Sequence, residues 1–187
     1  YYSGSVAASV FRTVDSKAVK RVIILAPSHR VSFNGVMAPH YTKFNTPIRS
    51  ISVDTRSVKK LLKQKMFVSS NRADKNAFLT EHSLEIELPF IAWYFPKAKI
   101  VPLIVGNISV DQCHVIAEQL KPLCDKKTLL VVSSDFTHHG DQYNYKPFTQ
   151  DVLDNIRLLD NTILQPIFTP STTSLYNVLK KTKATVC

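Results

Sequence analysis

The sequence predicts an α/β fold with a largely parallel central sheet flanked by helices. Short apolar runs rich in β-branched residues occur at Val22–Ala26, Lys99–Gly106 and Thr128–Ser133. Such continuous runs are typical of strands that are covered on both faces. Helix-like segments alternate with them, and this alternation is typical of parallel sheets. The 187 residues are expected to form a single domain.

Amphipathic patterns predict four helices, at Ser57–Lys65, Ser109–Cys124, Gln150–Asp160 and Ser171–Lys181. In the second of these, apolar residues recur at helical spacing from Val110 to Leu120, and either Ser109 or Asp111 can cap its start. Ser171 is the expected N-cap of the last helix.

Two polar stretches lack a clear period. We expect Asn34–Asn45 to form a loop or an irregular edge hairpin, and Asn71–Phe78 to form another loop. The chain opens on Tyr1 rather than Met, and it ends on Cys187 after a β-like run, Ala184–Val186. We therefore expect a domain that is truncated at both ends.

Composition argues against several classes of protein. No stretch approaches the ~18 apolar residues of a membrane span, so no membrane partner is expected. Three cysteines without a CxxC pair disfavour a disulfide framework and a zinc ribbon. Together with a start unlike a signal peptide, they indicate a reducing compartment, and we expect a cytoplasmic protein. The net charge of +10 invites nucleic-acid binding, but the lysines are scattered, so this class of function ranks last.

Polar residues that directly follow the apolar runs are candidates for a pocket, because ligands bind open α/β sheets at the carboxyl ends of the strands. Ala26–Arg30 follows the first run and contains His29. This histidine suits a neutral imidazole ligand or a general base. The alternative is a loop histidine that is hydrogen-bonded to the backbone.

The third apolar run leads into Ser133–Gly140, with sequence SSDFTHHG. Asp135 and His138 are three residues apart, so on a turn they can face one point, where the carboxylate orients the imidazole or shares a site with it. His139 is expected to point elsewhere. The alternative is a helix cap beside two surface histidines.

A third candidate segment is Thr80–Phe90, where Glu81 and Glu85 lie close to His82 in sequence. The alternative is a solvated acidic helix N-terminus, which the helix macrodipole favours. Histidines and carboxylates of these segments, together with Cys187, would bind iron, copper or zinc if they converged on one point.

Six ordered segments resemble the motifs of one known family: Tyr2–Ala8, Ala26–His29, Glu81–Phe90, Val105–Gly106, Ser133–His138 and Thr185–Cys187. They resemble the Memo-like family. Its bacterial and archaeal members are called AmmeMemoRadiSam system protein B, and its eukaryotic member is named mediator of ErbB2-driven cell motility. The resemblance covers the whole chain, so residues 1–187 are expected to be one Memo-like domain.

The resemblance implies an α/β/α sandwich similar to the class III non-haem iron extradiol dioxygenases, with a metal-type pocket at one end of the sheet. The family's metal ligands are two histidines and one cysteine. Two of them correspond to His29 and Cys187. The other histidine belongs to a Pro-His-Ala-Gly motif that would precede Tyr1.

The resemblance also places an aspartate, a histidine and a tyrosine in this pocket, and they correspond to Asp135, His138 and Tyr2. We expect Asp135, His138 and His82 to be the catalytic residues, with His82 or His138 moving protons near neutral pH. Tyr2 and Glu81 are expected to line the pocket.

The expected function is metal binding with redox or oxygen-related chemistry on an unknown small molecule, as in a metal-dependent oxidoreductase. Iron is the first expectation, and copper and zinc are the alternatives. A thiolate ligand departs from the two-histidine, one-carboxylate iron triad of oxygenases, which leaves open whether the protein is an enzyme. The alternative is a non-enzymatic signalling module that binds a phosphorylated peptide or another anion through the same pocket.

Overall fold

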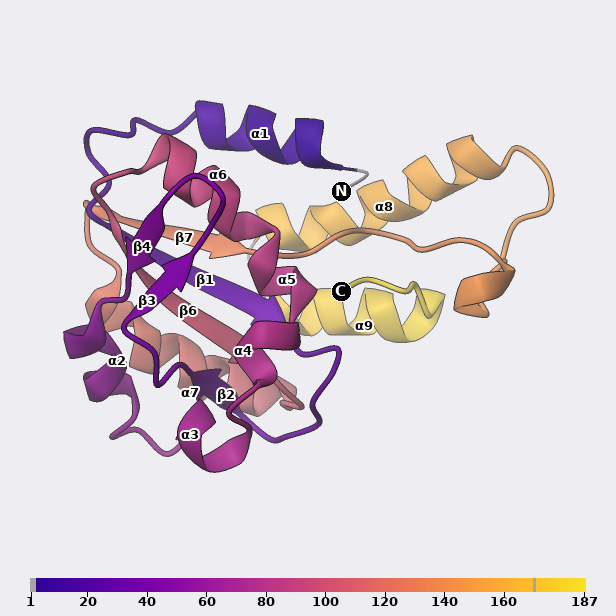
Figure 1. The fold of residues 1–187 in the computed structure, drawn as a ribbon. Helices are drawn as coiled ribbons and strands as arrows, with labels where there is room; N and C mark the ends of the chain where they lie inside the picture. Colours follow the sequence, from indigo (N-terminus) through magenta and orange to yellow (C-terminus); the bar gives the residue numbers. More distant parts are fainter. Residues whose placement is uncertain (1–2, 170) are drawn as a thin grey trace. The chain divides into compact units, whose positions relative to one another are not determined.

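A computed structural model describes residues 3–169 and 171–187 (Figure 1). The chain divides into two compact units, Tyr1–Ser133 and Ser134–Cys187, called here the first and the second unit. Each unit is described by itself. Among the described residues, no helix combines the length and the apolar character that crossing a bilayer requires.

The first unit is built around a five-stranded sheet in the order β5-β2-β6-β1-β7. Its strands are β1 (Arg21–Pro27), β2 (Val36–Ala38), β5 (Phe67–Ser69), β6 (Lys99–Val105) and β7 (Thr128–Val132). β1 lies between β6 and β7 and runs parallel to both. β5 is parallel to β2, whereas β2 is antiparallel to β6. The predicted α/β class with a largely parallel sheet is confirmed.

The two central strands are buried on both faces. Val22, Ile23 and Ile24 of β1 are fully buried, as are Ile100 and Val101 of β6. Since neighbouring side chains point to opposite faces of a sheet, both faces must be covered at these strands. The helices that flank the sheet provide this cover (Figure 1).

The register of the sheet places the carboxyl ends of three strands at the same edge. Leu25 of β1 is aligned with Leu103 of β6 and with Val132 of β7. The segments that follow these strands therefore begin side by side. They start at Ser28, Gly106 and Ser133, and the sequence predicted the segments at Ser28 and Ser133 to border a pocket.

The helices of the first unit are α1 (Gly4–Arg12), α2 (Thr55–Leu61), α3 (Ser70–Ala73), α4 (Ala77–Thr80), α5 (His82–Glu85), α6 (Glu87–Tyr94) and α7 (Val110–Leu120), followed by a 3₁₀ turn at Lys121–Leu123. Ser109, rather than Asp111, caps α7. Its side chain accepts from the Gln112 N–H, while the Gln112 side chain accepts from the Ser109 N–H. This capping box satisfies two donors at the helix start.

Two expected loops contain regular structure. The Asn34–Asn45 stretch contributes β2 to the main sheet and β3 (Lys43–Asn45) to a hairpin with β4 (Ser50–Ser52). The Asn71–Phe78 stretch contains most of α3 and the start of α4. These elements are three or four residues long, which is too short to establish a period in the sequence. Burial between neighbouring strands, as for Met37 of β2, stabilises them instead.

The second unit contains α8 (Val152–Phe168) and α9 (Thr172–Thr182), which pack against each other, and a 3₁₀ turn at Asp141–Tyr143. Ser171 caps α9 as predicted, because its side chain accepts from the Ser174 N–H. The expected strand near the C-terminus is wrong: the described residues 183–187 include no strand. Lys183 adopts a left-handed conformation with φ of 53°, which turns the chain out of α9.

Candidate functional site

Glu81 is the centre of a cluster at the carboxyl edge of the sheet, which we call the first cluster: His29, Glu81 and His82. His29 follows β1, and Glu81 is the N-cap of α5, of which His82 is the first residue. The Glu81 side chain is only 1% exposed. A carboxylate is rarely buried to this extent unless charged or hydrogen-bonding partners surround it.

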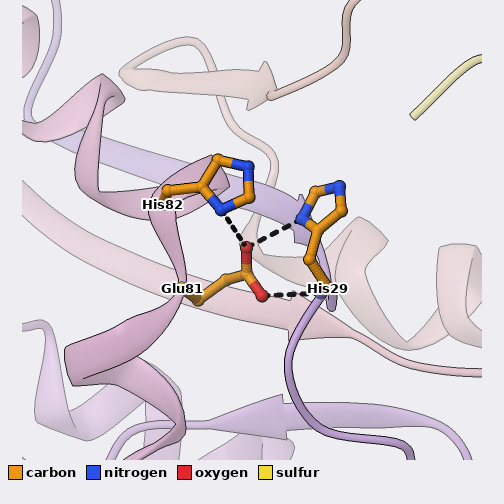
Figure 2. Close-up of side chains that lie close together, drawn as sticks. All are labelled: His29, Glu81 and His82. Atoms are coloured by element: carbon orange, nitrogen blue, oxygen red, sulfur yellow. Dashed lines mark hydrogen bonds and ion pairs between the residues drawn. The ribbon is translucent and has the colours of Figure 1, made fainter. Parts of the chain in front are cut away.

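Two neighbouring segments supply those partners, and Figure 2 shows the contacts from His29. The His29 backbone N–H donates to Glu81 Oε2 at 2.6 Å, and His29 Nδ1 lies 2.8 Å from Oε1. The Ser83 N–H donates to Oε1 at 3.2 Å, and Ser83 Oγ lies 2.9 Å from the same atom. Ser83 Oγ also lies 2.8 Å from the Pro27 carbonyl oxygen, so α5 is tied to the end of β1.

These contacts determine the charge of Glu81. Burial alone raises the pKa of a carboxyl group, because it disfavours the ionised form. Here the hydrogen bonds from His29 and Ser83 outweigh burial and lower the pKa of Glu81 from 4.5 to about 2. Glu81 is therefore an ionised carboxylate at neutral pH.

An ionised carboxylate also selects the tautomer of His29. Because the carboxylate only accepts hydrogen bonds, His29 Nδ1 carries the proton that it donates to Glu81, and Nε2 keeps its lone pair. Metal-binding histidines are commonly oriented in this way, by a carboxylate on the other ring nitrogen. His29 Nδ1 is thus bonded to a side chain, whereas the alternative interpretation was a hydrogen bond to the backbone.

His82 stands beside His29 over the same carboxylate. Its Nδ1 lies 3.5 Å from Glu81 Oε1, at ion-pair rather than hydrogen-bond distance, and the centroids of the two imidazole rings are 4.6 Å apart. Figure 2 shows the second nitrogen of each ring on the side away from Glu81. The side chains of His29 and His82 are 29% and 61% exposed.

Backbone contacts hold the neighbouring loops together. The Asn107 N–H donates to the Phe33 carbonyl at 2.7 Å, and the Gly106 N–H donates to the Gly35 carbonyl at 2.9 Å. A Cβ atom at Gly106 would collide with the Phe33 carbonyl oxygen, so this close approach requires glycine. The loops border an open hollow of about 220 Å³, lined by Ser28, His29, Arg30, Val31, Ser32, Gly106 and Asn107.

A second carboxyl group lies near the end of β7. Burial raises the pKa of Glu87, and a hydrogen bond from Ser133 partly opposes this effect. Ser133 is itself buried, and its N–H donates to the Leu25 carbonyl at 2.8 Å. Glu87 therefore takes up a proton more readily than Glu81 does.

The second unit contains another group of potential ligands, which we call the second cluster: Asp135, His138 and Cys187. His138 Nε2 lies 3.2 Å from Asp135 Oδ2. One ligand atom from each of the three residues lies within 4.8 Å of the others. Carboxylate, imidazole and thiolate together suit a borderline first-row metal.

Thr185 holds His138 in place. The His138 N–H lies 3.1 Å from Thr185 Oγ1, and Thr185 Oγ1 donates to the His138 carbonyl at 2.7 Å. His138 Nδ1 lies 2.7 Å from the Thr185 carbonyl oxygen, which only accepts, so Nδ1 carries a proton and Nε2 faces Asp135. Ser134 Oγ donates to the Cys187 carbonyl at 2.6 Å, which ties the last residue to the same segment.

The structure groups the predicted site residues by unit. His29, Glu81 and His82 lie together in the first unit, and Asp135, His138 and Cys187 lie together in the second unit.

Glu81 is buried, so the alternative of a solvated acidic helix start does not hold for it, although Glu85 is exposed. His139 points elsewhere, with Nε2 3.2 Å from the Phe148 carbonyl oxygen. Tyr2, predicted to line the pocket, lies outside the described residues.

Sequence analysis missed two supporting residues. Ser83 follows Glu81 by two positions at the start of a helix, which is a local N-cap pattern that could have identified it as a donor to Glu81. Thr185 offered no such signal, because its partner His138 lies 47 positions away in the chain.

Comparisons with known proteins identify relatives that are similar in sequence over the whole chain. The chain is 33% identical over 196 residues to "Protein memo-1 homolog" of Caenorhabditis elegans, and the match covers all of this chain and 54% of the worm protein. It is 30% identical over 194 residues to "Protein MEMO1" of Homo sapiens and of Mus musculus, covering all of this chain and 64% of each. The chain thus spans about half to two-thirds of the length of these curated relatives. The family described as "Memo-like protein" matches residues 1–187, and the chain belongs to this family.

Proposed function

We propose that this chain binds a first-row transition metal, with iron the first candidate and copper or zinc the alternatives. One observation carries the proposal: the ionised and buried Glu81 lies 2.8 Å from His29 Nδ1 and orients the imidazole ring. Such carboxylate–histidine pairs commonly support metal ligands.

His29 and Cys187 are the proposed ligands, following the resemblance to the Memo-like family. Each lies within a cluster of three side chains whose donor atoms fit a borderline metal. Cys187 is an exposed cysteine, and a thiolate is a ligand that first-row metals accept.

The proposed catalytic residues are Asp135, His138 and His82. In the second cluster, the Thr185 carbonyl keeps the proton on His138 Nδ1, so Nε2 is the atom that accepts or delivers a proton, with Asp135 stabilising the protonated ring. His82 Nδ1 faces Glu81, which would stabilise a positive charge on that ring as well. Glu81 and Tyr2 are the proposed pocket residues.

Iron or copper, when bound, supplies one-electron redox chemistry and reactivity toward oxygen. The proposed activity is therefore that of a metal-dependent oxidoreductase acting on a small molecule. The cysteine ligand distinguishes the proposed site from the two-histidine, one-carboxylate triad. A cytoplasmic location remains part of this proposal.

Elemental analysis of anaerobically purified protein, with titration by Fe(II) and Cu(I), tests the proposal. His29→Ala and Cys187→Ser should each lower the bound metal strongly. His114→Ala and Cys124→Ser are matched controls, because they remove an exposed histidine and an exposed free cysteine elsewhere in the first unit. The proposal is wrong if the wild-type chain stays empty in both titrations, or if the controls lose as much metal as the site variants.

A binding module for phosphorylated or other anionic ligands is the second candidate. The hollow beside His29 favours it, because the exposed Arg30 and the polar side chains of Ser32 and Asn107 line it. Binding of phosphotyrosine that survives a chelator and is lost in Arg30→Gln, but not in Arg49→Gln, would support this candidate. Binding that disappears with the metal would argue against it.

A further inference from the structure

We infer that the first unit binds a small phosphate-bearing anion at the amino edge of its sheet, in a hollow bordered by Lys20, Lys99 and Lys127. This edge is where β1, β6 and β7 begin, whereas the first cluster lies where they end. β1 has seven residues, so at about 3.3 Å per residue the two edges are about 20 Å apart. The inferred site is therefore separate from the proposed metal site.

The register of the sheet brings together three lysines that are far apart in the sequence. Lys99 is the first residue of β6, and Lys20 and Lys127 directly precede β1 and β7. The three strands run in the same direction (Figure 1), and Arg21 of β1 is aligned with Lys99 and with Thr128. The Lys20 N–H donates to the Lys127 carbonyl at 2.8 Å, and the Lys99 N–H donates to the Lys20 carbonyl at 3.0 Å. Backbone hydrogen bonds thus hold the three lysines side by side.

An open hollow of about 220 Å³ lies at these strand starts. Its lining consists of the three lysines, Arg21, Thr128 and two carboxylates, Asp54 and Asp125. One water molecule takes up ~30 Å³ in the liquid, so an ion of several heavy atoms has room here. Four cationic and two anionic side chains give the lining a net charge of +2. A ligand with at least two negative charges would balance it.

The two carboxylates of the hollow pair with Arg21. Arg21 Nε donates to Asp54 Oδ2 at 2.9 Å, and Arg21 Nη1 lies 3.8 Å from Asp125 Oδ2. Burial raises the pKa of Asp54, but hydrogen bonds from Ser57 and Arg21 outweigh burial and lower this pKa overall. A hydrogen bond from the Lys127 N–H lowers the pKa of Asp125. Both carboxylates are therefore ionised, and the guanidinium between them leaves the lysines as the surplus positive charge.

The lysine ammonium groups are available for a ligand. Among the described residues, no carboxylate lies within ion-pair distance of Lys20, Lys99 or Lys127. All three lysines are exposed, and Lys20 Nζ donates to the Lys17 carbonyl at 3.2 Å. Ammonium groups bind phosphate as compact point charges. The lining contains no aromatic side chain on which a nucleic-acid base could stack, which favours a small phosphate-bearing ion over an RNA strand.

Inorganic pyrophosphate is the probe that tests the inference, and calorimetric titration of the metal-free chain measures its affinity. An ionic strength of about 0.15 M largely screens attraction from distant surface charges. We expect the wild type to bind, and Lys99→Gln and Lys127→Gln each to bind about threefold to tenfold less tightly. Lys43→Gln is the control, because it removes the same charge from an exposed position at the start of β3. It should match the wild type.

A variant that strengthens binding complements these losses. Asp125→Asn removes a negative charge from the hollow, so pyrophosphate should bind about twofold or more tighter. Asp74→Asn is its control, because the two aspartates make the same local contact. Asp125 Oδ1 accepts from the Lys127 N–H at 2.8 Å, and Asp74 Oδ1 accepts from the Asn76 N–H at 2.7 Å. Equal affinities in the two aspartate variants would contradict the inference.

The other outcomes are equally clear. A wild-type chain that does not bind pyrophosphate overturns the inference, even if it binds an RNA oligonucleotide. An equal loss in Lys43→Gln would mean that the net charge of +10 attracts the anion diffusely, which also overturns it. A loss in Arg30→Gln without a loss in Lys99→Gln would place the anion at the carboxyl edge instead. Thermal unfolding of the lysine variants should match the wild type, because the replaced side chains are exposed. None of these results depends on the metal titrations that test the proposed function.

Discussion

Glu81 Oε1 lies 2.8 Å from His29 Nδ1, although 52 positions separate the two residues in the chain. The His29 backbone N–H donates to the other oxygen of the same carboxylate at 2.6 Å. One buried side chain therefore fixes both the backbone and the imidazole of the segment that follows β1. Folding of the first unit and orientation of the proposed ligand depend on the same contact.

Replacing Glu81 by glutamine should weaken metal binding by about 10–100-fold. The amide lacks the negative charge that holds the proton on His29 Nδ1, and its nitrogen cannot accept one of the two hydrogen bonds from His29. Competition with a chromophoric chelator measures the affinity. Glu85→Gln, at an exposed position of the same helix, is the control, and affinities that are equal in the two variants would contradict the prediction.

The contribution of Glu81 to stability should depend on pH. Its pKa is lowered from 4.5 to about 2 in the folded state, so the stabilisation is complete above pH 4.5 and is lost as the pH falls toward 2. The difference corresponds to about 3 kcal/mol. Urea unfolding of wild type and Glu81→Gln should show a difference in stability that shrinks between pH 5 and pH 2.5. A difference in stability that stays constant over this range would show that the ionised form of Glu81 does not stabilise the fold.

Thr185→Val should weaken the contact between His138 and Thr185, although the bonds from His138 to the Thr185 carbonyl oxygen remain. Valine has a similar shape but lacks the hydroxyl that accepts from the His138 N–H and donates to the His138 carbonyl. Each lost hydrogen bond is worth about 0.5–1.5 kcal/mol, so the His138 amide should exchange with solvent about tenfold faster. Amide hydrogen exchange measures this rate. Thr169→Val, which removes a hydroxyl bonded to the Gln165 carbonyl in the same unit, should leave it unchanged.

Gly106→Ala should destabilise the first unit by about 1–3 kcal/mol, because the new methyl group would collide with the Phe33 carbonyl oxygen and ring. Gly4→Ala is the matched control. Its Cβ would meet its nearest neighbour at 3.9 Å, an ordinary contact, and alanine favours the helix. Chemical denaturation compares the two, and equal effects would mean that the close approach of the loops is not required.

The central part of the fold was predictable from sequence. β1, β6 and β7 are continuous apolar runs, and strands that are buried on both faces need such runs. β2 was not predicted, because three residues establish no period and its place between β5 and β6 depends on strands far along the chain. The residues before Cys187 have side chains that suit a strand, but they form none. The Thr185 carbonyl instead accepts from the His138 N–H, a distant contact that the local sequence does not reveal.

The sequence by itself determined which residue types follow the apolar runs, and it therefore identified His29 and Asp135 as candidate site residues, with Glu81 as a candidate from the segment Thr80–Phe90. The tertiary structure alone decided that Glu81 is buried beneath His29, that His82 shares its carboxylate, and that Thr185 fixes the tautomer of His138. The physical reason is that local patterns report burial and turns over a few residues. The charge of Glu81 and the orientation of each imidazole depend on hydrogen bonds between segments that only folding brings together.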